Sequence, residues 1–194
     1  MAKVTCKKFT YAKYVSGGDG AAIVYSGGSM LTDYLAKAEI TEERTNETEY
    51  ADGHLIDSEQ IPTAVQMVME LVNNNAAIKK DVLGLAETGT GDSAELQLTD
   101  ADPPFVGAGV LMANRHLGVI TWEGYWVYKT QFTRNGVSAE TRRERTSWQH
   151  ETITGKGVAV QLSSGGNVAY YAHKDGMTEA AAEAWLKAHA GISG

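Results

Sequence analysis

The feature of the sequence that most constrains the fold is a run of aromatic residues at every second position within residues 119–133. One face of this segment carries Trp122, Gly124, Trp126, Tyr128 and Phe132. The positions between them are mainly polar, as at Glu123 and Gln131. Successive side chains of a β-strand point to opposite faces, and aromatic residues are enriched in strands. We therefore predict a strand whose aromatic face is buried.

Other segments show the same alternation, or a short run of strand-forming residues bounded by turn signals. The predicted strands are residues 9–15, 21–25, 34–44, 61–72, 105–113, 119–133, 148–154, 158–162 and 168–173. Residues 61–72 also fit a helix, but their alternation favours a strand. Thr45-Asn46 and Asp52-Gly53 are predicted turns, and residues 85–104 are predicted to form a long loop.

Two helices are predicted. Residues 76–83 follow a run of asparagines that supplies an N-cap, and Gly84 ends this short helix. Residues 178–190 begin at Thr178, which serves as the N-cap, and stop at Gly191. We expect the apolar face of this helix to consist of Ala181, Trp185 and Ala188.

These elements favour a mainly β protein, a β-sandwich or barrel with a short flanking helix and a C-terminal helix. The length of 194 residues favours one domain. We divide it into N-terminal strands and a loop (1–33), a β core (34–174) and a C-terminal helical tail (175–194). The single Cys6 excludes an intramolecular disulfide. We find no apolar signal segment and no membrane span, and expect synthesis in a cytoplasm.

The chain is acidic, with a formal net charge of −7 from 24 acidic and 17 basic residues. Residues 39–59 hold eight acids and only Arg44, so this segment alone sums to 1 − 8 = −7. Tight binding of nucleic acid phosphates is disfavoured by that charge. A basic cluster follows later, at Arg142, Arg143 and Arg145. The two clusters are either solvated faces or complementary surfaces that meet between copies.

No catalytic, cofactor or metal motif is apparent, so we predict no enzyme and no cofactor. The five histidines show no ligand spacing, and no Gly-x-Ser-x-Gly motif occurs. The glycine-rich residues 89–93 lack the Gly-Lys ending of a phosphate-binding loop. The clustered carboxylates leave one alternative open, because a β-sandwich that binds or cleaves carbohydrate requires acids of this kind.

The order of motifs from residue 34 to about residue 157 resembles the major tail proteins, or tail-tube proteins, of long non-contractile-tailed bacteriophages, especially those of Gram-positive hosts. An alternating strand at residues 37–41 leads to the acidic-aromatic element Glu49-Tyr50-Ala51-Asp52. Then come a short helix ending Asp81-Val82-Leu83-Gly84 and a strand opened by Pro103-Pro104-Phe105. The last matching elements are residues 125–132 and 149–155.

The resemblance implies a β-sandwich-like tail-tube fold and hexameric rings that stack into a hollow tube in the virion tail, assembled in the host bacterial cytoplasm. It also implies partners: other copies of the chain, a tape measure protein, a tail terminator and distal tail proteins. Double-stranded DNA would pass through without specific binding, and acidic walls suit such a conduit because they repel phosphates. The candidate contacts between subunits are Arg142, Arg143, Arg145, Glu39, Glu43 and Glu49. A low-copy tail terminator or initiator of the same fold is a further alternative.

Overall fold

The computed structural model describes residues 2–51, 54–73, 75–136 and 150–192. Within these ranges the protein is mainly β, built around an eight-stranded antiparallel sheet. Its strands are β1 (Ala2–Ser16), β2 (Val24–Leu31), β3 (Leu35–Ala51), β4 (His54–Leu71), β7 (Val106–His116), β8 (Val119–Arg134), β9 (Glu151–Gly157) and β12 (Tyr171–Met177). Their order is β2-β1-β7-β8-β9-β4-β3, with β12 also paired to β8.

Smaller elements complete the chain. β5 (Ala86–Thr88) pairs with β6 (Glu95–Gln97), with a 3-10 turn (Gly91–Ser93) between them, and β10 (Val160–Gln161) pairs with β11 (Val168–Ala169). The two helices are α1 (Ala76–Asp81) and α2 (Glu179–Ala190). Among the described residues no helix combines the length and hydrophobicity needed to cross a bilayer.

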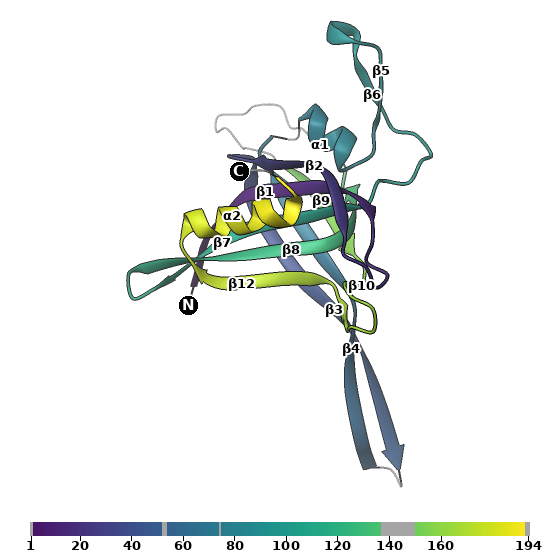
Figure 1. The fold of residues 1–194 in the computed structure, drawn as a ribbon, viewed down its shortest axis with the longest axis vertical. Helices are drawn as coiled ribbons and strands as arrows, with labels where there is room; N and C mark the ends of the chain where they lie inside the picture. The colour runs from purple at the N-terminus through teal and green to yellow at the C-terminus, as the bar shows by residue number, and fades with distance from the viewer. Residues whose placement is uncertain (1, 52–53, 74, 137–149, 193–194) are drawn as a thin grey trace, which may run out of the picture.

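The large sheet divides at β8, and this division produces a sandwich. β12 pairs with the first half of β8, around Trp126, and β9 pairs with its second half, from Thr130 onward. The layer β9-β4-β3 folds across the layer that contains β1, where the Cys6 thiol lies 3.8 Å from the carbonyl oxygen of Ala36. α2 lies on the outer face of the β1-β7-β8 layer (Figure 1). The predicted mainly β, sandwich-like fold is therefore confirmed.

Two hydrophobic cores lie on opposite sides of the β1-β7-β8 layer. The inner core, between the two layers, contains Phe9, Met67, Val110 and Phe132 among its buried residues. The outer core lies beneath α2 and contains Leu111, Trp122, Trp126, Ala182 and Leu186. β7 contributes to both, so its residues 106–114 are all buried. A strand covered on both faces reads as a continuous apolar run.

Glycines on the outer side of β7 make room for the Trp126 ring. A Cβ at Gly107 would lie 2.5 Å from a Trp126 ring atom, and one at Gly109 would lie 2.7 Å from another. No side chain larger than hydrogen fits at that distance. The buried indole therefore depends on two glycines of the neighbouring strand.

The prediction that Trp126 and Phe132 lie on the same face of the strand is wrong. β8 contains an extra residue relative to β7 between Val127 and Thr130, whose partners Ala108 and Val106 are only two residues apart. A β-bulge of this kind reverses the side to which later side chains point. Trp126 therefore faces α2, whereas Phe132 faces the inner core, with its ring centroid 6.4 Å from that of Phe9.

The turn predicted at Thr45-Asn46 is also wrong, because β3 continues unbroken to Ala51 and pairs with β4 as far as His54. β2 begins at Val24 and contains Gly27-Gly28, which the sequence indicated as its end. Glycine stands inside this strand because the end of α2 approaches it closely: a Cβ at Gly28 would lie 2.4 Å from the carbonyl oxygen of Ala190.

Other predicted boundaries changed in smaller ways. The loop at residues 85–104 contains the β5–β6 hairpin. The strand predicted at residues 168–173 is divided between β11 and β12. Both helices are confirmed, with Asn75 and Thr178 as N-caps.

The expected apolar face of the C-terminal helix is wrong. Its buried residues are Ala182, Leu186 and Ala190, which lie one or two positions beyond the predicted residues, and Trp185 lies half-buried at the edge. α2 approaches the sheet at Gly124, where a Cβ would lie 2.6 Å from the Trp185 ring. The packing of α2 on the sheet, rather than the spacing of its largest side chain, sets its buried face.

Candidate assembly surfaces

β3 and β4 continue beyond the body of the molecule as a two-stranded ribbon, the β3–β4 arm, defined as residues 44–51 and 54–62 (Figure 1). In the body, β4 also pairs with β9, but only from Val65 to Leu71. Among the described residues no third strand accompanies the arm. A two-stranded ribbon is at best marginally stable in water. The arm therefore gains little stability from the rest of its own chain.

The arm has two chemically different faces, because directly opposite residues of an antiparallel ladder point to the same side. Its acidic face consists of the opposed residues Glu47 and Glu59, and Glu49 and Asp57. Its neutral face carries Asn46, Gln60, Thr48 and Ser58. The four carboxylates border a shallow cleft of about 200 Å³. Like charges directly opposite destabilise a strand pair, so the acidic face makes the isolated arm still less stable.

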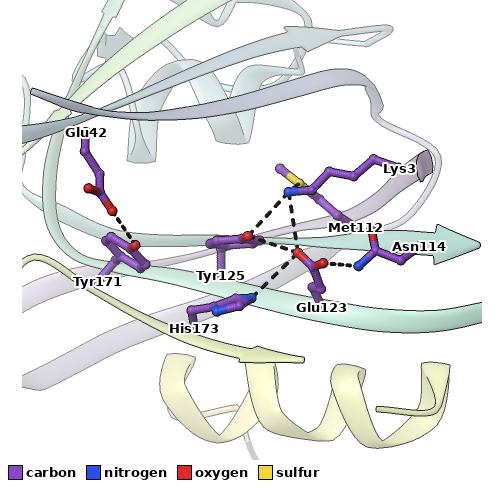
Figure 2. A network of polar contacts seen from close by, with 8 residues as sticks. All are labelled: Lys3, Glu42, Met112, Asn114, Glu123, Tyr125, Tyr171 and His173. Atoms are coloured by element: carbon purple, nitrogen blue, oxygen red, sulfur yellow. Dashed lines mark hydrogen bonds and ion pairs between the residues drawn. The ribbon is translucent and has the colours of Figure 1, made fainter. Parts of the chain in front are cut away.

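The base of the arm is held by two tyrosines near the start of β12. The Tyr170 hydroxyl donates a hydrogen bond to the carbonyl oxygen of Pro62 at 2.7 Å. The Tyr171 hydroxyl donates to Oε1 of Glu42 at 2.6 Å (Figure 2). Oε2 of Glu42 accepts from the guanidinium of Arg44. Together these donors lower the pKa of Glu42, while the Glu42 carboxylate raises the pKa of Tyr171 to about 12.

A second polar cluster surrounds Glu123, whose side chain is only 13% exposed. Asn114 donates to its Oε1, and the Tyr125 hydroxyl donates to its Oε2 at 2.9 Å (Figure 2). Lys3 Nζ and His173 Nε2 lie 3.4 Å and 3.6 Å from Oε2. Burial and the hydrogen bond to Glu123 raise the pKa of Tyr125 to about 12.

This cluster joins four strands. Lys3, Asn114 and His173 come from β1, β7 and β12, while Glu123 belongs to β8. The rings of Tyr125 and His173 are also stacked, with centroids 4.4 Å apart. Both oxygens of Glu123 already accept hydrogen bonds, so the arrangement is that of an ion-pair network that fastens the strands to one another. Among the described residues no three His, Cys, Asp or Glu side chains converge as a metal site.

A second projection, the β5–β6 arm (residues 86–102), leaves the body on the side of α1, away from the β3–β4 arm (Figure 1). It is held at its base by the Lys80–Glu87 ion pair at 2.6 Å and by Gln131, which donates to the carbonyl oxygen of Pro103 at 2.8 Å. Leu98 in this arm is 85% exposed. Leu98 directly follows β6, beyond the Ala86–Gln97 pair at the root of the hairpin, and this exposed apolar side chain lacks a partner in the described part of the chain.

The predicted contact residues of the acidic segment lie along one strand, β3. Glu39 and Glu43 already pair with cations of the same chain, at 3.4 Å from Lys37 and 3.2 Å from Lys156. Glu49 lies on the acidic face of the arm. The predicted basic counterpart, Arg142, Arg143 and Arg145, lies outside the described residues. The pairing of these arginines with the acidic segment therefore stays a prediction.

Comparison with known proteins adds one distant structural similarity. No protein-family model matches the chain, and no curated protein sequence matches it. Among solved structures, the chain is similar to a chain in the six-fold symmetrised cryo-EM structure of the anti-feeding prophage baseplate. The TM-score is 0.38 and the identity 9%, over 92% of this chain and 98% of that chain. A TM-score below 0.5 does not establish a common fold.

Proposed function

We propose that this protein is a virion structural subunit that assembles with its own copies into stacked hexameric rings, the tail tube of a long non-contractile-tailed bacteriophage. The β3–β4 arm carries the proposal together with the sequence resemblance. It is a long ribbon that leaves the body, pairs only with itself among the described residues and opposes carboxylate to carboxylate. An element that is marginal alone becomes stable when another chain covers it.

The directions in which the arms leave the body support polymerisation. The β3–β4 arm and the β5–β6 arm project away from each other (Figure 1). An arm that binds a different surface of the next copy makes a heterologous contact, which generates a ring when the rotation closes and a filament when it does not. Stacked rings require both kinds of contact. The hexameric number itself comes from the family resemblance.

The placement of charge fits a conduit for DNA. The four carboxylates of the acidic face make no ion pair among the described residues, so they are available either to a cationic surface of another copy or to the lumen. An acidic lumen repels phosphates, and DNA would pass without being held. In this proposal the tube also meets a tape measure protein, a tail terminator and distal tail proteins, and it resides in the virion tail.

Electron microscopy of the concentrated protein in negative stain tests the proposal. We expect rings and tubes, and mass photometry should show species heavier than the 20.8 kDa chain. Monomers under all conditions, including after addition of tail-initiator proteins, would contradict it. A low-copy terminator or initiator has the same geometry, so copy number in purified virions decides between them: a tube subunit is present in many rings, a terminator in one.

A further inference from the structure

We propose that the β5–β6 arm of one copy docks on the part of the sheet that α2 leaves uncovered in a second copy. This inference rests on the proposed self-assembly and names one of its contacts. This uncovered sheet face presents the exposed side chains of Val4 and Ile120 beside the buried Ala113 and Trp122, with the start of α2 at Thr178 and Glu179 as its border. These residues line an open cleft of about 460 Å³.

The cleft exists because α2 is too short to cover the outer face completely. Its buried residues, Ala182, Leu186 and Ala190, pack over the middle of the β1-β7-β8 layer. Beyond the first turn of α2 the sheet continues to the β7–β8 turn. There Val4 is 50% exposed and Ile120 is 55% exposed. Apolar side chains that continue a buried face into solvent mark a contact surface.

The rim of the cleft carries two cations, Lys7 and Arg115, and one acid, Glu179. Lys7 lies with its Nζ 5.1 Å from the centroid of the Trp122 ring and 2.9 Å from a Glu179 oxygen. Arg115 lies directly opposite Ile120 in the β7–β8 ladder, so it projects from the same face of the sheet. Arg115 is exposed and makes no ion pair with any residue in the described ranges. An occupant with apolar side chains flanked by acids would complement this surface.

The β5–β6 arm has that composition. Its second strand continues as Glu95-Leu96-Gln97-Leu98-Thr99-Asp100, with two leucines at every-second spacing between acidic residues. Leu98 is 85% exposed, and strands of three residues are too short to be stable without further packing. Figure 1 places this arm at the α1 side of the body, whereas the start of α2 lies at the far end of the sheet. Because the β5–β6 arm and the cleft of one chain lie far apart, the arm that fills the cleft comes from a second copy.

Cross-linking between single-cysteine chains tests this contact. Leu98→Cys and Ile120→Cys are introduced into separate Cys6→Ser chains that carry different tags, and the two chains are mixed at assembling concentration and oxidised. We expect a mixed disulfide dimer that contains both tags. The matched control replaces Ile120→Cys by Val168→Cys, at a position that is 60% exposed on β11. This control pair should cross-link at least tenfold less.

The outcomes separate the docking contact from the tube. Tubes that form without an enriched 98–120 cross-link would overturn the docking and leave the tube standing. A cross-link in particles that never form rings would support the docking and contradict the tube. Enriched coupling of Ser58→Cys, in the β3–β4 arm, to Ile120→Cys instead of Leu98→Cys would overturn the docking, because the other arm would then fill the cleft.

A second variant pair gives a measurement that does not depend on oxidation. Leu98→Glu should weaken self-association by about tenfold or more, because it replaces a leucine that would become buried. Leu98→Met keeps the apolar volume and should assemble as the native chain does. Equal assembly of the two variants would contradict the proposal. Both should have the native melting temperature, because Leu98 lies in solvent in the monomer.

Discussion

Removing one pair of opposed charges from the arm should have opposite effects on the monomer and on its assembly. Glu47 and Glu59 face each other directly across the β3–β4 ladder. Carboxylates about 6 Å apart in water repel by about 0.7 kcal/mol, and physiological salt reduces this to about 0.3 kcal/mol. At about 1.4 kcal/mol per factor of ten, the double variant Glu47→Gln/Glu59→Gln should make the arm about 1.6-fold more protected from hydrogen exchange at physiological salt, and about threefold at low salt.

Assembly should change in the other direction where the acidic face meets a cationic surface of another copy, which is the first of the two roles proposed for it. Hydrogen exchange of arm peptides in dilute monomer measures the first effect, and light scattering with electron microscopy measures the second. The melting temperature of the monomer should not change, since the arm lies outside both cores. The control variant Thr48→Ala/Ser58→Ala alters an opposed pair on the neutral face without changing charge.

Two results would refute this reasoning. Arm amides that exchange faster in the double variant would show that the opposed carboxylates do not repel in the folded arm. Tubes that form as readily as those of the native chain would show that the acidic face is not a contact surface. A loss of assembly in the neutral-face control alone would transfer the contact to the other side of the arm.

Three further changes test the body of the protein. Tyr171→Phe should remove a contribution to the free energy of unfolding that the native chain has below about pH 10 and loses as the pH rises toward 12. The reason is that Tyr171, whose pKa is raised to about 12, no longer donates a hydrogen bond to Glu42 once it is ionised. Melting curves of both chains across this pH range measure the difference. Trp126→Ala empties a fully buried site and should cost about 3–5 kcal/mol in urea unfolding. Gly124→Ala would place a Cβ 2.6 Å from the Trp185 ring and should cost about 1–3 kcal/mol, with a change in tryptophan fluorescence as α2 shifts.

Local signals in the sequence predicted most elements of the body. The β7–β8 hairpin follows from alternation, and the helices follow from their caps at Asn75 and Thr178. The bulge in β8 has no such signal, because the residues around Tyr128 and Lys129 continue the alternating pattern. It arises from tertiary packing: the second half of β8 pairs with β9 and faces the inner core, and Phe132 turns inward with it.

The sequence did not predict the β3–β4 arm, because this segment contains two turn signals. Thr45-Asn46 and Asp52-Gly53 both read as turns, and only the second agrees with a ladder that pairs Glu47 with Glu59. A sequence argument from cross-strand charge would reject that ladder, since it opposes like charges. The clusters around Glu123 and Glu42 also depend on partners far away in the chain, such as His173 and Tyr171, which no local pattern brings together.

The segment that leads into the arm and forms most of it holds a charge equal to the net charge of the chain. Residues 39–59 sum to −7, equal to the whole chain, so the remaining residues sum to zero. The acids nearest the body are matched by cations of the same chain: Glu39 by Lys37, Glu42 by Arg44 and Glu43 by Lys156.

The charge that no ion pair of the described residues compensates thus lies on the acidic face, beyond the point where β4 stops pairing with β9. Residues 44–62 carry 1 − 5 = −4, and all other residues together carry 16 − 19 = −3. The arm is therefore far more densely charged than the body, so it repels acidic surfaces and attracts cationic ones. In the proposed assembly, charge placed in this way selects where a second copy binds, and contact with a cationic surface offsets the repulsion between the opposed carboxylates of the arm.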